Sequence, residues 1–171
     1  SAWVASAPIL MPVSLISIPL ISAMPPISIR SSGDANRSFS AGNKVRTPSE
    51  LVRHMASLIG YARTFFHAGR YWPGPLPTLS AEVARFHEQI ALLGQDLASG
   101  APLRDITLEQ LLRGPIADTM THAGQLAMLR RIAGVPIPPE NFLFAGMSPD
   151  NLGPEQPPPA RPDAEWPERL P

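Results

Sequence analysis

Residues 114–131 read GPIADTMTHAGQLAMLRR and decide the fold of this chain. Asp118 and His122 lie four residues apart in this stretch, so on a helix both side chains leave one face, one turn apart. Leu126 and Leu129 continue that face, which predicts that the pair looks inward. A buried carboxylate and a buried imidazole are costly unless they are paired with each other or bound to a metal ion.

The composition of the chain predicts one domain with a balanced charge. The chain has 171 residues, with 14 Lys+Arg against 14 Asp+Glu and a pI near 6.9, so nothing favours nucleic acid or an anionic membrane as a partner. It has no cysteine, which excludes disulfides, thiolate zinc sites and a cysteine nucleophile. Any metal ion must therefore be held by histidine and carboxylate side chains.

Proline divides the chain into three parts. Of the 22 prolines, eleven follow residue 135, five precede residue 27, and only five lie within residues 49–131. Because proline interrupts helices, we expect an irregular N-terminal segment at 1–43, a helical domain at 44–134 and a Pro-rich C-terminal arm at 135–171.

The apolar residues 9–29 are almost long enough to span a bilayer. Four prolines break this stretch, and no Lys or Arg precedes it, so it does not have the pattern of a signal peptide. A membrane-tethered domain is one alternative, but we do not expect a membrane partner.

Three helices are predicted from capping residues and from apolar side chains that recur every three or four positions. They are expected over residues 47–67, 78–100 and 107–134. Capping boxes open the first and the third, and Gly114-Pro115 should kink the third. A four-helix bundle needs one more helix, for which residues 1–40 are a poor source. Either that helix is lost from this chain or a partner subunit covers the gap, so we expect a homodimer.

His54 lies on the first predicted helix, on or beside its buried stripe, and is the candidate for a third ligand. Together, His54, Asp118 and His122 would form the arrangement of two histidines and one carboxylate found in catalytic Zn, Ni or Fe centres. The simpler alternative is that His122 is a core histidine whose partner is Asp118. We expect His87 to lie at the boundary of the core. We expect His67 to lie at a helix C-terminus, where the helix dipole favours a cation.

Two stretches of this chain resemble the DinB-like family of bacterial four-helix-bundle proteins. The first is residues 46–55, RTPSELVRHM, and the second is residues 118–126, DTMTHAGQL, followed by LRR at 129–131. The resemblance covers the chain from residue 46 to residue 134, roughly half of its length, and implies an all-α DinB-like four-helix bundle.

The resemblance also implies a set of metal ligands. Members of the family typically bind a divalent metal ion through one histidine on the second helix and a His-x-x-x-His pair on the fourth. The matching positions here are His54, Asp118 and His122. Asp118 stands where the family usually has histidine, and a carboxylate can still bind a metal ion.

Family members of known chemistry are thiol-dependent transferases or isomerases that use low-molecular-weight thiols such as bacillithiol or mycothiol. By this resemblance we expect a cytoplasmic, metal-dependent enzyme of the thiol-transferase or hydrolase type that acts on a small electrophile. Tyr61, as a hydrogen-bond donor, and Gln125, as a group that orients a ligand, are the candidate catalytic residues. The alternative is a non-enzymatic DinB-like stress or interaction scaffold whose metal site has degenerated at Asp118.

Overall fold

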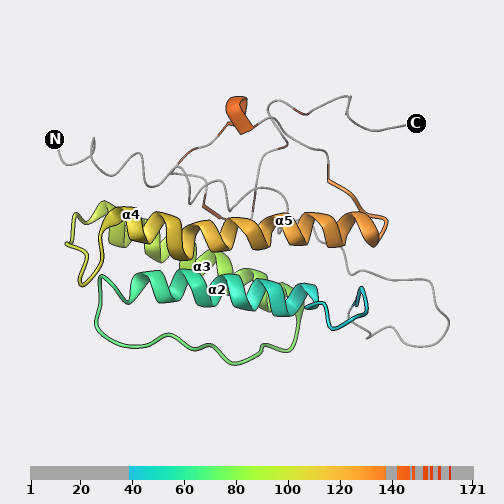
Figure 1. Cartoon of the computed structure of the whole chain (residues 1–171), viewed down its shortest axis with the longest axis horizontal. Coiled ribbons are helices and arrows are strands. Elements are labelled where there is room, and N and C mark those ends of the chain that lie inside the picture. Colours follow the sequence, from blue (N-terminus) through green and yellow to red (C-terminus); the bar gives the residue numbers. More distant parts are fainter. Residues whose placement is uncertain are drawn as a thin grey trace.

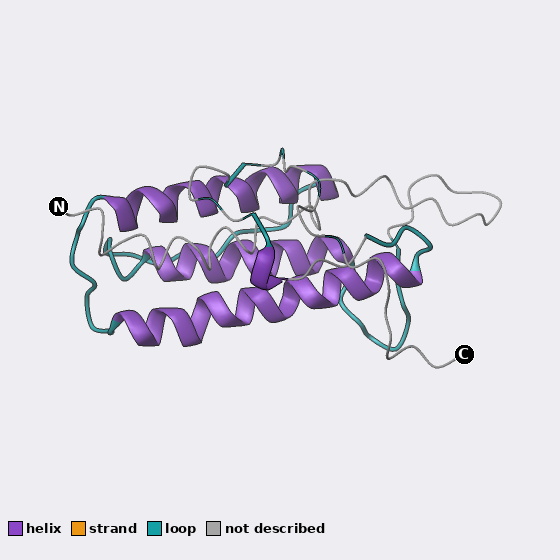
Figure 2. Cartoon of the chain, turned by 90° about the horizontal axis from the view of Figure 1, so that it is seen from above, coloured by secondary structure: helices purple, strands orange, loops and turns teal. Residues whose placement is uncertain are grey.

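A computed structural model of the chain describes residues 39–137 and 142–146, together with single positions as far as residue 162. Throughout this part the regular structure is helical, which confirms the expected all-α class. Helices α2 (Pro48–Arg63), α3 (Leu79–Ala98) and α5 (Ala117–Ile132) lie side by side (Figures 1 and 2). The apolar stretch at 9–29 lies outside the described residues, as does most of the Pro-rich arm.

Helix α2 spans Pro48–Arg63 and begins where the capping box predicts. The hydroxyl of Thr47 accepts a hydrogen bond from the backbone N–H of Glu50 at 3.3 Å, and Glu50 Oε2 accepts one from the backbone N–H of Thr47 at 2.7 Å. The helix ends at Arg63 rather than near His67, so the expected C-terminal boundary was four residues too long. The reason is local, because the Thr64 hydroxyl donates to the carbonyl of Tyr61 and the chain turns there.

Helix α3 spans Leu79–Ala98 and begins after Thr78, whose hydroxyl accepts from the backbone N–H of Ala81 at 3.2 Å. The segment between α2 and α3 is not helical and runs beside α2 (Figure 1). After α3 the chain turns at Gly100, whose φ of +70° is a conformation that glycine adopts without steric cost.

The third predicted helix is divided in the structure, as its Gly-Pro pair indicates. A short helix, α4, spans Leu108–Leu111, a π-helical turn, η1, spans Leu112–Ile116, and α5 spans Ala117–Ile132. Gly114 has non-helical angles inside the π turn, and Pro115 follows it. Proline cannot donate a backbone hydrogen bond, which explains why the regular helix is interrupted at this place.

The core lies between the helices, and α2 is the central element because it contacts α3, α5 and η1. The largest fully buried side chains of the core are Phe86, Leu51, Met55, Ile59, Ile90, Leu93, Leu111, Ile116, Leu126 and Leu129. In the described residues, each helix is too short or too polar to cross a membrane.

Candidate metal centre

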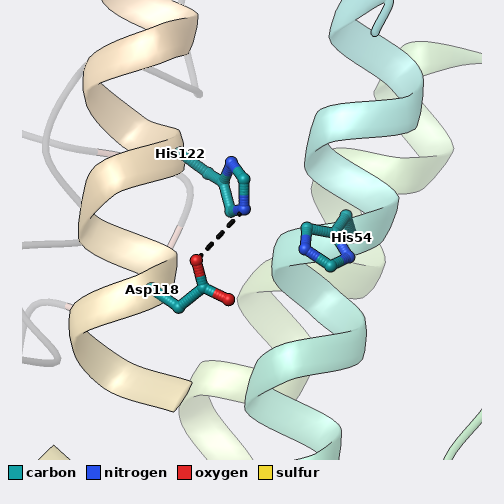
Figure 3. Close-up of side chains that lie close together, drawn as sticks. All are labelled: His54, Asp118 and His122. Carbon is teal, nitrogen blue, oxygen red and sulfur yellow. Dashed lines mark ion pairs between the residues drawn. The ribbon is translucent and has the colours of Figure 1, made fainter. Parts of the chain in front are cut away.

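The three residues chosen from the sequence as metal ligands come together in the structure. His54 projects from the middle of α2 towards α5, and Asp118 and His122 project from the first turns of α5 to meet it (Figure 3). One ligand atom from each residue lies within 4.8 Å of those of the other two. This group could therefore hold a metal ion.

His122 is the most buried of the three residues and has contacts at both ring nitrogens. Its Nε2 lies 3.3 Å from Asp118 Oδ1, and its Nδ1 lies 3.0 Å from the amide oxygen of Gln125. Because an amide oxygen only accepts hydrogen bonds, Nδ1 carries the proton and donates it to Gln125. Gln125 thereby fixes the His122 ring so that Nε2 faces the other two residues, which is how metal-bound histidines are commonly oriented.

The ring of His54 packs edge-on against that of His122, with 4.7 Å between the ring centroids and 77° between the planes. Burial lowers the pKa of His54 below its usual 6.5, and the positive charges of Arg46 and of a protonated His122 lower it further, whereas Asp118 raises it. The net effect favours the neutral imidazole, which is the form that binds metal ions.

The donor set fits a divalent ion. Zinc–nitrogen bonds of about 2.0–2.1 Å place the donors of a tetrahedral site roughly 3.3 Å apart. Asp118 and His122 already have this separation. His54 lies on the second helix, and its donor atom is within 4.8 Å of those of Asp118 and His122. Two neutral imidazoles and a carboxylate suit Zn, Ni or Fe.

The contacts are also those of the simpler alternative, a histidine paired with an aspartate one turn earlier. Asp118 is 48% exposed at its side chain, so the pair does not require a metal ion to offset burial of the carboxylate. This alternative does not explain why His54 approaches the pair from a second helix.

The two candidate catalytic residues occupy different places. Gln125 contacts His122 directly. Tyr61 lies two turns beyond His54 on α2, where its side chain is 51% exposed and packs edge-on against Phe65 with ring centroids 4.9 Å apart. Tyr61 also lines the same cavity as His54.

That cavity has a volume of about 680 Å³ and lies between α2 and residues 71–75. Its wall includes His54, so it opens beside the candidate metal centre. Its lining includes charged and aromatic side chains, among them Arg46, Arg53, Tyr61, Tyr71 and Trp72.

A polar cluster that the sequence did not indicate joins α2 to α3. Asp96 on α3 accepts a hydrogen bond from Arg63 Nε at 2.8 Å and lies 2.7 Å from His67 Nε2, while Arg63 also donates to Gln89 at 3.2 Å. His67 therefore has a specific partner as well as its position beyond a helix end. The partners lie 26 to 33 residues apart in the chain, so local spacing gives no signal of them.

His87 is more buried than its position on the predicted helix indicated. It is only 4% exposed, and its Nδ1 lies 3.1 Å from the carbonyl oxygen of Leu152, which accepts its hydrogen bond. The expectation of a boundary position was wrong because Leu152, which contacts His87, belongs to the C-terminal arm. The spacing of apolar residues within α3 gives no signal of that contact.

No family model, curated protein or solved structure matches this chain. The resemblance to the DinB-like family therefore depends on the two stretches that contain His54 and the Asp118–His122 pair.

Proposed function

We propose that His54, Asp118 and His122 bind a divalent metal ion, Zn²⁺, Ni²⁺ or Fe²⁺, and that this chain is a metal-dependent enzyme with a DinB-like four-helix bundle. The observation that carries the proposal is the approach of three metal-binding side chains from two helices. The orientation of His122 by Gln125 supports it. We propose in addition that the protein is bacterial and cytoplasmic, because the family resemblance implies both.

The reaction we propose is transfer of a thiol to a small electrophile, or hydrolysis of such a molecule. A divalent ion with three protein ligands keeps positions open and lowers the pKa of a thiol or water bound there. The chain has no cysteine, so the thiol would be an external low-molecular-weight compound. Tyr61, half exposed on the cavity wall that includes His54, is the hydrogen-bond donor that we propose for this reaction.

We also propose that the chain forms a homodimer through α5. Its side chains Met120, Met128 and Ile132 are 37%, 56% and 59% exposed, and they recur at multiples of four residues. Side chains four apart lie on one helix face, so together they form an apolar stripe. A second copy of this chain would bury it.

The decisive experiment is metal analysis of the purified full chain after loading with Zn²⁺, Ni²⁺ or Fe²⁺ and removal of free metal. We expect one ion per chain in the unchanged protein and none in His54→Ala or His122→Ala. His67→Gln is the matched control, because it changes a histidine that lies outside the triad. Gln125→Leu should retain the site with about 10- to 100-fold weaker affinity, since it removes the partner that orients His122.

The result also separates the enzyme from the scaffold. Absence of bound metal in the unchanged protein, with equal thermal stability in His122→Ala, would contradict the metal site and leave the non-enzymatic alternative. Bound metal without any thiol-dependent consumption of an activated aryl halide would retain the site and contradict the transferase.

A further inference from the structure

The cavity between α2 and residues 71–75 has the size of a small-molecule site. Its volume of about 680 Å³ lies within the roughly 300–1,000 Å³ that such sites commonly have. One wall is formed by α2, and the other by residues 71–75 of the non-helical segment that runs beside α2 in Figure 1. Asp118 and His122 are not part of the lining, so His54 is the residue that the cavity shares with the centre that we propose for the metal ion.

The charged groups in the lining have an excess of one positive charge. Arg46 and Arg53 face the cavity, and Glu50 is the acidic residue in the lining. Glu50 Oε2 is already occupied, because it accepts hydrogen bonds from the backbone N–H and the hydroxyl of Thr47 at 2.7 and 2.8 Å. Among the described residues, neither guanidinium has an ion pair. A cavity wall with two guanidiniums and one carboxylate that already accepts hydrogen bonds favours a ligand that carries a negative charge.

The aromatic side chains of the lining suit a flat ligand. Trp72 is 93% exposed and Tyr61 is 51% exposed, so both present ring surface to solvent at the cavity. Tyr71 is held differently, because its ring lies directly against the backbone at Gly60, where any Cβ would overlap it. The small residue at position 60 thus allows the ring of Tyr71 to form one side of the cavity. Aromatic walls of this kind bind planar rings by stacking.

The wall formed by the non-helical segment is fixed to α3. Glu82, which is 1% exposed, accepts a hydrogen bond from the backbone N–H of Leu76 at 2.8 Å. Arg85 donates to the carbonyl of Gly74 at 2.7 Å and lies 3.4 Å from Glu82. A wall that is already in place costs less to order when a ligand binds, so the cavity is preorganised.

We propose that this cavity binds a small planar aromatic molecule that carries one carboxylate. The guanidiniums of Arg46 and Arg53 bind the carboxylate, and Tyr61 and Trp72 contact the ring. The binding site depends on the cavity alone. Its role as the substrate site rests on the function proposed above, since His54 in the cavity wall would place the ligand beside the metal ion.

The test is calorimetric titration of the full chain with 2-naphthoate and with its neutral analogue 2-naphthamide, both in the presence of EDTA. We expect 2-naphthoate to bind one molecule per chain. The amide should bind about tenfold more weakly or worse, because it lacks the charge-assisted hydrogen bonds. The double variant Arg46→Met/Arg53→Met should lose a similar factor for 2-naphthoate and nothing for the amide. Arg113→Met is the matched control, since Arg113 is exposed and lies outside the cavity.

Two outcomes would overturn the inference. Equal affinity for the acid and the amide would show that the negative charge does not contribute to binding. Unchanged affinity of the double arginine variant for 2-naphthoate would show that Arg46 and Arg53 do not bind it. Gly60→Ala supplies a second check, because displacing Tyr71 should weaken both ligands while circular dichroism shows the helices intact.

His122→Ala separates this inference from the metal proposal. It should lose the metal ion and still bind 2-naphthoate as the unchanged protein does. Failure of 2-naphthoate to bind a chain that holds metal would contradict the cavity site alone. If the unchanged protein takes up no metal ion in the metal analysis but binds 2-naphthoate, the cavity site is retained and its role as a substrate site is contradicted.

Discussion

The side chains of the candidate metal centre differ in how far local sequence determines their contacts. His122 meets Asp118 and Gln125, which lie four residues before it and three residues after it. Positions with these spacings share a helix face, so the sequence predicts both contacts once α5 is recognised as a helix. The contact with His54 depends instead on how α2 packs against α5. The sequence indicated it through the buried stripe of the first helix and through the family resemblance.

His87 predicts a dependence of stability on pH. Burial lowers the pKa of His87 below its usual 6.5, and the hydrogen bond to the Leu152 carbonyl offsets part of this effect. The unfolded chain then binds a proton more tightly than the folded chain, so acid favours unfolding. The contribution of the neutral ring to stability is fully present above about pH 6.5 and is lost as the pH falls through the lowered folded-state pKa. His54, whose pKa is also lowered, acts in the same direction.

The measurement is the free energy of unfolding in urea at pH 7.5 and at pH 5. We expect a lower value at pH 5 and a smaller difference between the two pH values in His87→Gln. His67→Gln serves as the control because His67 is largely exposed. An equal difference in the unchanged protein and in His87→Gln would show that the buried ring does not cause the dependence.

At the scale of the element, helix starts follow from the sequence more reliably than helix ends. Thr47 and Thr107 open helices through capping boxes, which involve only four consecutive residues each. The break at Gly114-Pro115 is equally local. The end of α2 was misplaced because apolar residues continue beyond Arg63, and the periodic pattern cannot distinguish the last helical turn from the turn that follows it.

The exposed stripe of α5 predicts an effect on oligomeric state. A lysine at position 128 would place a charge in the middle of the apolar interface that we propose, where burying it without a partner is costly. We therefore expect light scattering to give twice the chain mass of 18.4 kDa for the unchanged protein and the chain mass itself for Met128→Lys. Leu108→Lys, at an exposed apolar position outside the stripe, should remain a dimer. A monomeric unchanged protein would refute the dimer.

At the scale of the whole molecule, the cluster around Asp96 fastens α2 to α3. Asp96 and Arg63 are 10% and 21% exposed at their side chains, and they lie 2.8 Å apart. Removing the carboxylate by Asp96→Ala leaves a half-buried guanidinium with Gln89 as its remaining polar contact in the cluster. We expect a loss of about 1–3 kcal/mol in the free energy of unfolding, measured by urea denaturation.

The control for this prediction is Glu109→Gln. Glu109 and Arg113 lie 4.0 Å apart on the surface, so this change should cost less than about 1 kcal/mol. Losses of equal size in the two variants would mean that burial gives the Asp96 cluster no advantage over a surface ion pair.

The sequence by itself determined the all-α class, the starts of the helices, the kink at Gly114-Pro115 and the pairing of Asp118 with His122. All of these depend on residues within a few positions of one another. Only the tertiary structure decided the distance from His54 to that pair, the burial of His87, the Asp96 cluster and the cavity beside residues 71–75. These depend on contacts between segments far apart in the chain. Such contacts are set by how whole helix faces pack, which local spacing in residues 114–131 does not encode.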